Sequence, residues 1–210
     1  MCLIKPSLTN FKEEPMEHEK WITSDTHLFH ENMLKFKDYN GMRIRPFSSL
    51  KEMHQTIIKN WNSVVGVNDY VYHLGDVTFK IGREFNELMH SLNGKKRLIV
   101  GNHDGRFLKE VGFTKHFEKI ELWHGYHDKD DGKCSFTMSH IPILLSQLRD
   151  GDFNVHGHMH QNEMKDPHYL NKCVELTNFT PVHFDTIFEE IRAVRKDLEN
   201  IDKINRNLNK

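Results

Sequence analysis

The sequence has few cysteines, almost no net charge and no long apolar run. Its 210 residues contain three cysteines, which lie far apart and form no CxxC pair. We therefore expect no disulfide framework and a reducing, cytoplasmic setting. The formal charge of −1 gives no general electrostatic argument for nucleic-acid or membrane binding, although a local basic pocket remains open. No apolar run reaches the length of a membrane span, and the start, MCLIKPSL, is a poor secretory signal.

What is present indicates a globular domain. Hydrophobic residues make up 37% of the chain and charged residues 28%, which suits one domain with a full-sized core. We expect an N-terminal extension over residues 1–19, a main domain over 20–185 and a C-terminal amphipathic helix over 186–210. The unusual count is 16 histidines, since histidine is a common metal ligand and proton carrier.

The first half alternates between apolar strands and helical periodicity. We predict strands over 21–24, 69–74 and 97–100, a short helix over 31–36, and longer helices after Ser49 and over 82–92. Ser49 and Glu52 have the spacing of a capping box at the start of the first long helix. This order is typical of a parallel or mixed sheet covered by helices.

The second half has the pattern of further strands, over 117–123, 134–139, 153–156 and 173–177. The sequence Asp130-Asp131-Gly132 indicates a hairpin turn between the first two. We expect a second sheet, more antiparallel than the first, so that the residues by themselves predict an α/β fold with two sheets. Thr186 and Glu189 then form another possible capping box. The helix that follows either packs on the domain or forms a short coiled-coil seam between two protomers, with apolar residues at Ile187, Ile191, Val194, Leu198 and Ile201.

Side chains suited to metal binding follow five of the predicted strands. Four segments run into tight turns, and His140 follows a fifth strand; the turns are Asp25-Thr26-His27, Gly75-Asp76, Gly101-Asn102-His103-Asp104 and Gly157-His158-Met159-His160. Loops at the carboxyl ends of strands in α/β sheets meet at one edge, where ligands bind. Imidazole and carboxylate ligands favour manganese, iron, nickel or zinc. Taken singly, each of these residues could be a cap or a core histidine, but their shared order favours a metal site.

This ordered set resembles the calcineurin-like metallophosphoesterases over roughly residues 20–185. The sequence around these motifs is similar to that of a small phosphoesterase subgroup of bacteria and phages; it includes WITSDTHLFHENMLKF, VYHLGDVTF and LIVGNHD. The resemblance implies a four-layer αββα sandwich of two mixed sheets flanked by helices. It also implies a hydrolase with two divalent ions, manganese fitting best and iron, nickel or zinc remaining open.

Roles for individual residues follow from the resemblance alone. Asp25, His27 and His160 would bind one ion, Asn102, His140 and His158 the other, and Asp76 both. His103 would lie over the substrate phosphate, oriented by Asp104. Two ions about 4 Å apart can clamp phosphate oxygens and activate a water for in-line attack on phosphorus, with His103 assisting the leaving oxygen.

The substrate is less defined than the metal site. We expect a small phosphodiester, for example a nucleotide, with a phosphomonoester or a nuclease substrate as alternatives on the same metal core. His30, Arg43 and Arg45 are candidate substrate-binding residues, because they lie near the motifs and arginine suits phosphate contacts. The alternative interpretation is that these residues lie in a solvated loop, where the arginines form ion pairs with glutamates. A non-enzymatic scaffold that binds a protein partner is the remaining option, favoured only by the C-terminal helix, through which a homodimer could also form.

Overall fold

The computed structural model describes residues 18–128, 134–149 and 152–208. The expected extension over 1–19 and the Asp130-Asp131-Gly132 turn therefore lie almost wholly outside the described residues. The α-helices are α1 (Leu50–Val64), α2 (Arg83–Ser91), α3 (Val111–Thr114) and α4 (Phe184–Leu208). Short 3-10 helices are η1 (Glu31–Leu34), η2 (Asp104–Phe107) and η3 (Leu145–Gln147). The short helix predicted over 31–36 is thus a single 3-10 turn.

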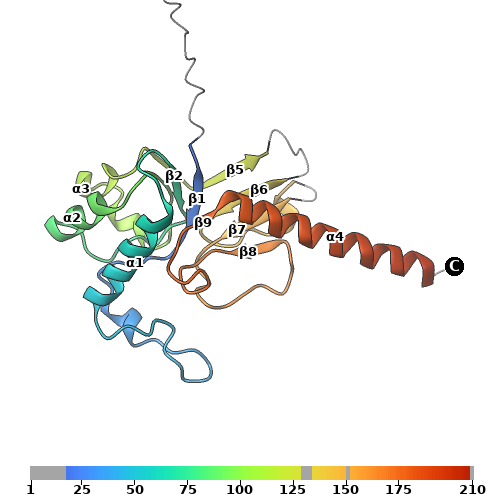
Figure 1. Ribbon diagram of the computed structural model, residues 1–210, viewed down its shortest axis with the longest axis horizontal. Helices are drawn as coiled ribbons and strands as arrows, with labels where there is room; N and C mark the ends of the chain where they lie inside the picture. The colour runs from blue at the N-terminus through green and yellow to red at the C-terminus, as the bar shows by residue number, and fades with distance from the viewer. Residues whose placement is uncertain (1–17, 129–133, 150–151, 209–210) are drawn as a thin grey trace, which may run out of the picture.

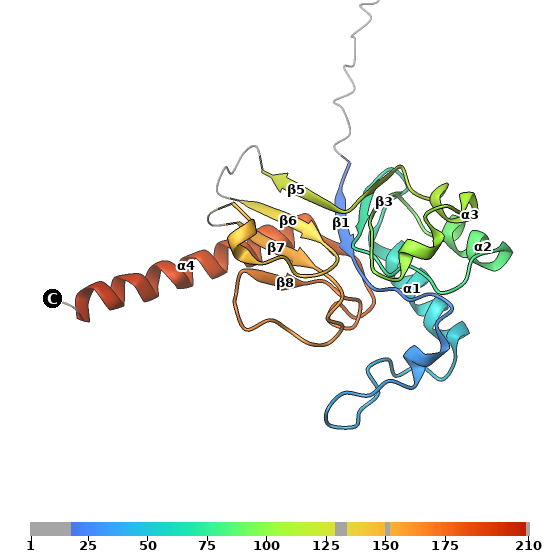
Figure 2. The same ribbon diagram turned by 180° about the vertical axis from the view of Figure 1, so that it is seen from behind.

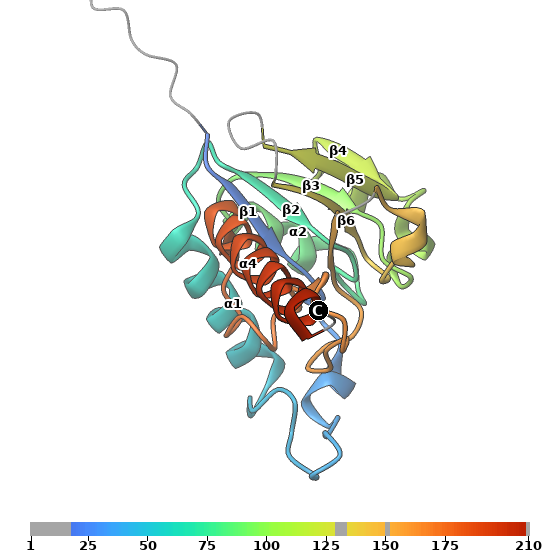
Figure 3. The same ribbon diagram turned by 90° about the vertical axis from the view of Figure 1, so that its right-hand side faces the viewer.

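The first sheet has five strands in the order β4-β3-β2-β1-β9, and Figure 3 shows β4, β3, β2 and β1 next to one another. Its members are β1 (Lys20–Thr23), β2 (Tyr70–His73), β3 (Lys95–Ile99), β4 (Lys119–Glu121) and β9 (Val182–His183). Strands β1 to β4 pair in parallel, whereas β9 runs antiparallel to β1. The sheet is mixed, which confirms the prediction for the first half of the chain.

The second sheet has the order β5-β6-β7-β8, with β5 (Trp123–His127), β6 (Ser135–Ser139), β7 (Phe153–His156) and β8 (Tyr169–Asn171). Among the described residues, one of the three pairings in this sheet is antiparallel, that of β5 with β6, against one of the four in the first sheet. The second sheet is therefore more antiparallel than the first, as expected, although most of its pairings are parallel. The strand predicted over 117–123 contains β4 but is interrupted at the exposed Leu122, where the chain passes from the first sheet to β5 of the second. Residues 173–177 form turns, since the amides of Leu176 and Thr177 donate to local carbonyls instead of to a strand.

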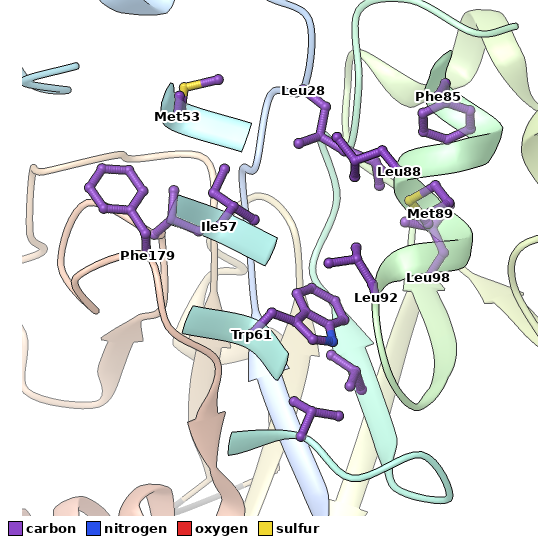
Figure 4. Packing of buried hydrophobic residues seen from close by; sticks show 14 of the residues in the cluster. Leu28, Met53, Ile57, Trp61, Phe85, Leu88, Met89, Leu92, Leu98 and Phe179 are labelled. Atoms are coloured by element: carbon purple, nitrogen blue, oxygen red, sulfur yellow. The ribbon is translucent and has the colours of Figure 1, made fainter. Parts of the chain in front are cut away.

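Two hydrophobic cores lie on opposite faces of the first sheet. Alternate residues of β2 point to opposite faces, so Val71 belongs to the core under α1, α2 and α3 and Tyr72 to the core shared with the second sheet. The first core contains Trp61, whose indole is 2% exposed and donates to the Asn93 carbonyl at 3.0 Å (Figure 4). The second core joins both sheets to the first turns of α4 through Phe184 and Ile187.

Helix α1 begins after Ser49, whose hydroxyl accepts from the Glu52 amide at 3.2 Å. The Glu52 carboxylate does not complete the capping box with Ser49; it accepts from the Ser48 amide at 2.7 Å instead. The predicted start of α1 is therefore confirmed, but the Glu52 side chain bonds to the amide of Ser48 and not to that of Ser49. Three buried residues, Met53, Ile57 and Trp61, recur at four-residue spacing and hold the helix on the sheet.

Helix α4 begins at Phe184, two residues before the predicted start, and directly after β9. Its first turns are buried, whereas Ile201 and Ile204 are 53% and 58% exposed. Figures 1 and 2 show its C-terminal half reaching beyond both sheets, and Figure 3 shows it foreshortened, with its C-terminus toward the viewer. No helix among the described residues is both long and apolar enough to cross a membrane.

Candidate metal centre

The turns that carry the candidate ligands meet because their strands are parallel neighbours. Strands β1, β2 and β3 end before Asp25, Asp76 and Asn102, and β6 and β7 end before His140 and His158. Backbone bonds tie the turns together, with the Asp25 amide donating to the Gly75 carbonyl and the His27 amide to the Asp76 carbonyl, both at 3.0 Å. The His158 amide donates to Asp25 Oδ2 at 2.9 Å, which links the two sheets. The structure therefore brings the ligand-bearing loops together, as the sequence predicts.

Five of the candidate ligands have a left-handed backbone. Their φ values lie between 47° and 68°; they are Asp25, His27, Asp76, His158 and His160. A side chain in this conformation costs roughly 1–3 kcal/mol per residue and persists only where the surroundings enforce it. Among the described residues, these are five of the eight non-glycine residues with positive φ, so the strain is concentrated at the metal-type side chains, which is typical of a functional site.

The first group of ligand atoms comes from Asp25, His27 and His160, whose nearest donor atoms lie within 4.8 Å of one another. Asp25 is fully buried, and its Oδ2 is occupied by the Ser24 hydroxyl at 2.5 Å and the His158 amide. Burial alone raises the pKa of this carboxyl, but the surrounding imidazoles, foremost His27, bring that pKa below its usual range. Asp25 is therefore an ionised, acceptor-only ligand.

Two buried atoms of this group have no hydrogen-bond partner, Asp25 Oδ1 and His27 Nε2. They lie 3.5 Å apart, and His27 Nε2 is equally far from Asp76 Oδ2. An unpaired buried polar atom costs about 1–3 kcal/mol, and a shared ion would satisfy both at once. The residues present thus fit a divalent cation, and they could hold a metal ion.

A second group of three lies beside the first and consists of Asp25, Asp76 and His140. His140 Nε2 is 3.6 Å from Asp76 Oδ2 and 2.8 Å from Asn102 Oδ1. Asn102 Oδ1 is also 3.0 Å from His158 Nδ1. The structure therefore brings together all seven residues that the resemblance assigned to metal binding, and it places Asp25 as well as Asp76 between the groups.

His103 and Asp104 differ in position. The His103 side chain is 43% exposed at the rim, with Nε2 3.9 Å from Asp76 Oδ2. Asp104 is fully buried, and its carboxylate accepts the amides of Asp76, Val77 and Gly101, each at 2.9 Å. Asp104 thus joins two of the ligand turns through their backbones, in place of the expected contact with the His103 ring.

Two of the motif glycines are required by close approach of the backbone to the site. A Cβ added at Gly101 would collide with the amide and carboxylate of Asp76, and one at Gly157 with the side chains of Ser24 and Asp25. Neither glycine has positive φ. Gly75 combines both requirements, since its φ is 95° and an added Cβ would collide with the Gly101 backbone.

An aromatic and cationic rim borders the first group. The His30 ring stacks on the Phe79 ring with centroids 3.6 Å apart, and His30 Nδ1 lies 3.4 Å from His27 Nδ1. The Arg106 guanidinium lies 4.4 Å from the Phe79 centroid, and the His103 ring 4.8 Å from it. Burial and neighbouring cationic side chains lower the pKa of His30 to about 4, so its ring is neutral near pH 7.

The two arginines proposed for substrate contact lie elsewhere. Arg45 is 0% exposed, and its guanidinium donates to backbone carbonyls and to Glu175, which corrects the expectation that it lines a pocket. Arg43 is exposed, and the bond found for it joins its Nη1 to the Phe47 carbonyl at 3.4 Å. Neither contacts the ligand side chains, whereas His30 does.

Sequence reasoning missed Glu175 and Phe79. Glu175 Oε1 lies 3.0 Å from His160 Nδ1, although 15 residues separate them in the chain. No motif marks Glu175, and Phe79 resembles an ordinary core residue. For Arg106, its position two residues after the Gly101–Asp104 segment was the available sign that it lies near the site.

Comparison with solved structures supports the fold. No family model matches the chain. A protein of unknown function from Aquifex aeolicus, AQ665, superposes with a TM-score of 0.63 and 24% identity over 82% of this chain and 98% of that one. This likeness shows a shared α/β fold with two sheets. A structure described as a novel archaeal phosphodiesterase aligns at a TM-score of only 0.42 and 16% identity, over 74% of this chain and 82% of its own, which is too loose to carry an argument.

Comparison of sequences gives closer relatives. The uncharacterised protein MJ1445 of Methanocaldococcus jannaschii is 34% identical over 180 residues, which cover 81% of this chain and 90% of that protein. The gene 66 protein of Mycobacterium phage L5 is 34% identical over 184 residues, or 74% of this chain and 84% of its own length. The chain belongs to the protein family that contains these archaeal and phage proteins.

Proposed function

We propose that this protein is a metal-dependent phosphoesterase with a dinuclear centre, acting on small phosphodiesters of nucleotide type. The observation that carries the proposal is the pair of adjacent ligand groups that share Asp25, with Asp25 Oδ1 and His27 Nε2 buried and unpartnered. Such a centre, loaded with manganese or with iron, nickel or zinc, supplies Lewis acidity to a phosphate and a nucleophile from water. The calcineurin-like αββα sandwich belongs to the same proposal, supported by the two mixed sheets.

The chain's own residues account for the remaining steps. Asp25, His27 and His160 would hold one ion, Asn102, His140 and His158 the other, and Asp76 would contribute to both. His103, partly exposed beside Asp76, is placed to donate a proton or hydrogen bond to the leaving oxygen. Asp104 fixes the spacing of the Asp76 and Gly101 turns.

Substrate contact is assigned to the rim of His30, Phe79 and Arg106. A guanidinium packed over a ring keeps its N–H groups available for an oxyanion. A neutral His30 beside Phe79 offers an aromatic surface for the ester group. This combination favours a diester with a planar group over inorganic phosphate. The cytoplasmic setting expected from the scattered cysteines belongs to the same proposal.

The test is a side-by-side assay of the metal-stripped and manganese-loaded protein on bis-para-nitrophenyl phosphate and para-nitrophenyl phosphate. Turnover is expected only with metal, with preference for the diester. D76N should abolish it, and H103A should lower kcat by roughly 100-fold to 10,000-fold. Preference for the monoester would select the phosphomonoesterase alternative, and cleavage of single-stranded DNA the nuclease.

Stoichiometric metal without turnover on any ester or nucleotide would overturn the enzymatic proposal. The protein-binding scaffold would then be the better explanation. Its structural support is the part of α4 that projects from the domain (Figure 1).

A further inference from the structure

Arg45 lies behind the first ligand group and contacts the turn that carries two of its members. The side chain is completely buried. Its Nη2 donates to the Asp25 carbonyl at 2.5 Å and its Nη1 to the Thr26 carbonyl at 2.8 Å. These carbonyls belong to the segment in which Asp25 and His27 have left-handed backbones, with φ of 57° and 47°. Arg45 therefore holds the strained turn through its backbone carbonyls, not through its ligand side chains.

Glu175 connects Arg45 to the third member of the group. Its side chain is 2% exposed, and Oε1 lies 2.6 Å from Arg45 Nη2 and 2.8 Å from Arg45 Nε. The same oxygen lies 3.0 Å from His160 Nδ1. A carboxylate oxygen only accepts, so Nδ1 of His160 carries the hydrogen, and Nε2 is left with its lone pair toward a cation.

We propose that Arg45 and Glu175 form a clamp that positions Asp25, His27 and His160 for one ion. Arg45 fixes the backbone of the first turn, and Glu175 fixes the tautomer and ring orientation of His160. Both are positioning residues, and neither touches the substrate. The inference rests on the proposed metal centre and adds to it an asymmetry between the two ion sites.

Among the described residues, the second group has Asp104 behind the Asp76 turn but no carboxylate behind the ring of a histidine. His140 Nδ1 donates to the Leu74 carbonyl at 2.7 Å, which is a neutral acceptor. A carboxylate behind a metal-binding histidine typically contributes 10-fold to 100-fold in metal affinity. The clamped group should therefore bind its ion more tightly than the group around His140.

A purely structural ion pair is the alternative explanation. Burying two charges has a large desolvation cost, and replacing such a pair by apolar residues is often neutral or stabilising. Stability alone thus gives little reason for Arg45 and Glu175 to be charged. The two explanations differ in what they predict for metal affinity in a variant that still folds.

The experiment is a Mn²⁺ titration of the full-length, metal-stripped protein by calorimetry, with ions counted by mass spectrometry after dialysis. The clamp variant is R45M/E175M, which removes both charges together. The matched control is K172M/E190M, which removes a pair with an N–O distance of 2.6 Å that does not touch the ligand residues. Circular dichroism establishes that each variant is folded.

We expect the wild type and K172M/E190M to bind ions in a tight and a weak step. R45M/E175M should lose about 10-fold to 100-fold in the tight step and keep the weak one. If the double variant does not fold, E175Q takes its place, with a smaller loss confined to the tight step. An unchanged tight step in the folded variant would overturn the clamp while leaving the metal centre intact. Absence of Mn²⁺ binding by the wild type would instead overturn both proposals.

Discussion

The imidazole of His30 lies flat against the phenyl ring of Phe79, with the two planes within 10° and the centroids 3.6 Å apart. The stack stands beside His27 and continues to Arg106. It thus joins the candidate metal centre to the rim that we propose as the substrate-contact surface.

Removing the cation from this rim should weaken binding of an anionic ester. In the manganese-loaded protein, R106A is expected to raise KM for bis-para-nitrophenyl phosphate by about 10-fold or more, because a hydrogen bond to a charged group is worth roughly 1.5–3 kcal/mol. R106K should recover only part of this, since an ammonium cannot reproduce the planar fork. R83A is the control, because Arg83 pairs with Glu87 on the surface of α2. Equal KM values for R106A and R83A would refute the assigned role.

Adding a single methyl group at Gly157 should disrupt the centre. The new Cβ would collide with Ser24 and Asp25, so G157A is expected to lose metal binding and about 1–3 kcal/mol of unfolding free energy. Gly112 has no atom within 4 Å of its added Cβ, so G112A provides a matched glycine substitution without crowding. Denaturant melts and manganese titrations of both variants measure the difference. Wild-type metal affinity in G157A would contradict the close approach described above.

Acid should destabilise the metal-free protein before its carboxylates titrate. His54 Nε2 accepts the Phe29 amide at 3.0 Å, and burial lowers the pKa of His54 to about 4. Between the unfolded value near 6.5 and this folded value, the unfolded chain binds the extra proton, so stability falls as pH decreases from about 6.5 to 4.

The variant H54Q isolates this contribution, because glutamine offers an acceptor to the same amide but does not titrate. Urea melts at several pH values should show a shallower fall in unfolding free energy for H54Q than for the wild type. The slope should not vanish, since His116 also has a pKa lowered to about 4. Identical slopes would show that His54 does not remain neutral in the folded state.

The projecting half of α4 is the proposed route to a homodimer. Ile201 and Ile204 expose apolar surface that continues the stripe of the buried Ile187 and Ile191. I201K/I204K should shift the protein toward monomer in light scattering after gel filtration. The control N200K/N207K adds the same charge at other exposed positions of the helix. A wild type that is monomeric at high micromolar concentration would rule out this dimer.

Much of the fold follows from local signals. Apolar runs predicted the first-sheet strands that end before Asp25, Asp76 and Asn102, and the capping preference of Ser49 located the start of α1. Parallel strands carry their following turns to a common edge, so the order of motifs was enough to predict which ligands would meet. The break at Leu122 and the turns over 173–177 were not predictable. An apolar run indicates a buried segment, but not which sheet it joins or whether it pairs with a strand at all.

What the sequence by itself determined is the set of metal-type residues and the α/β alternation that gathers them. Both depend on patterns only a few residues long. The tertiary structure decided what surrounds them, including the burial of Arg45 and its bond to Glu175, which is 130 residues away in the chain. An arginine near a motif has the same local sequence whether it faces substrate or solvent. Only the packing of distant segments, which removes its guanidinium from water and gives it fixed partners, settles which role it has.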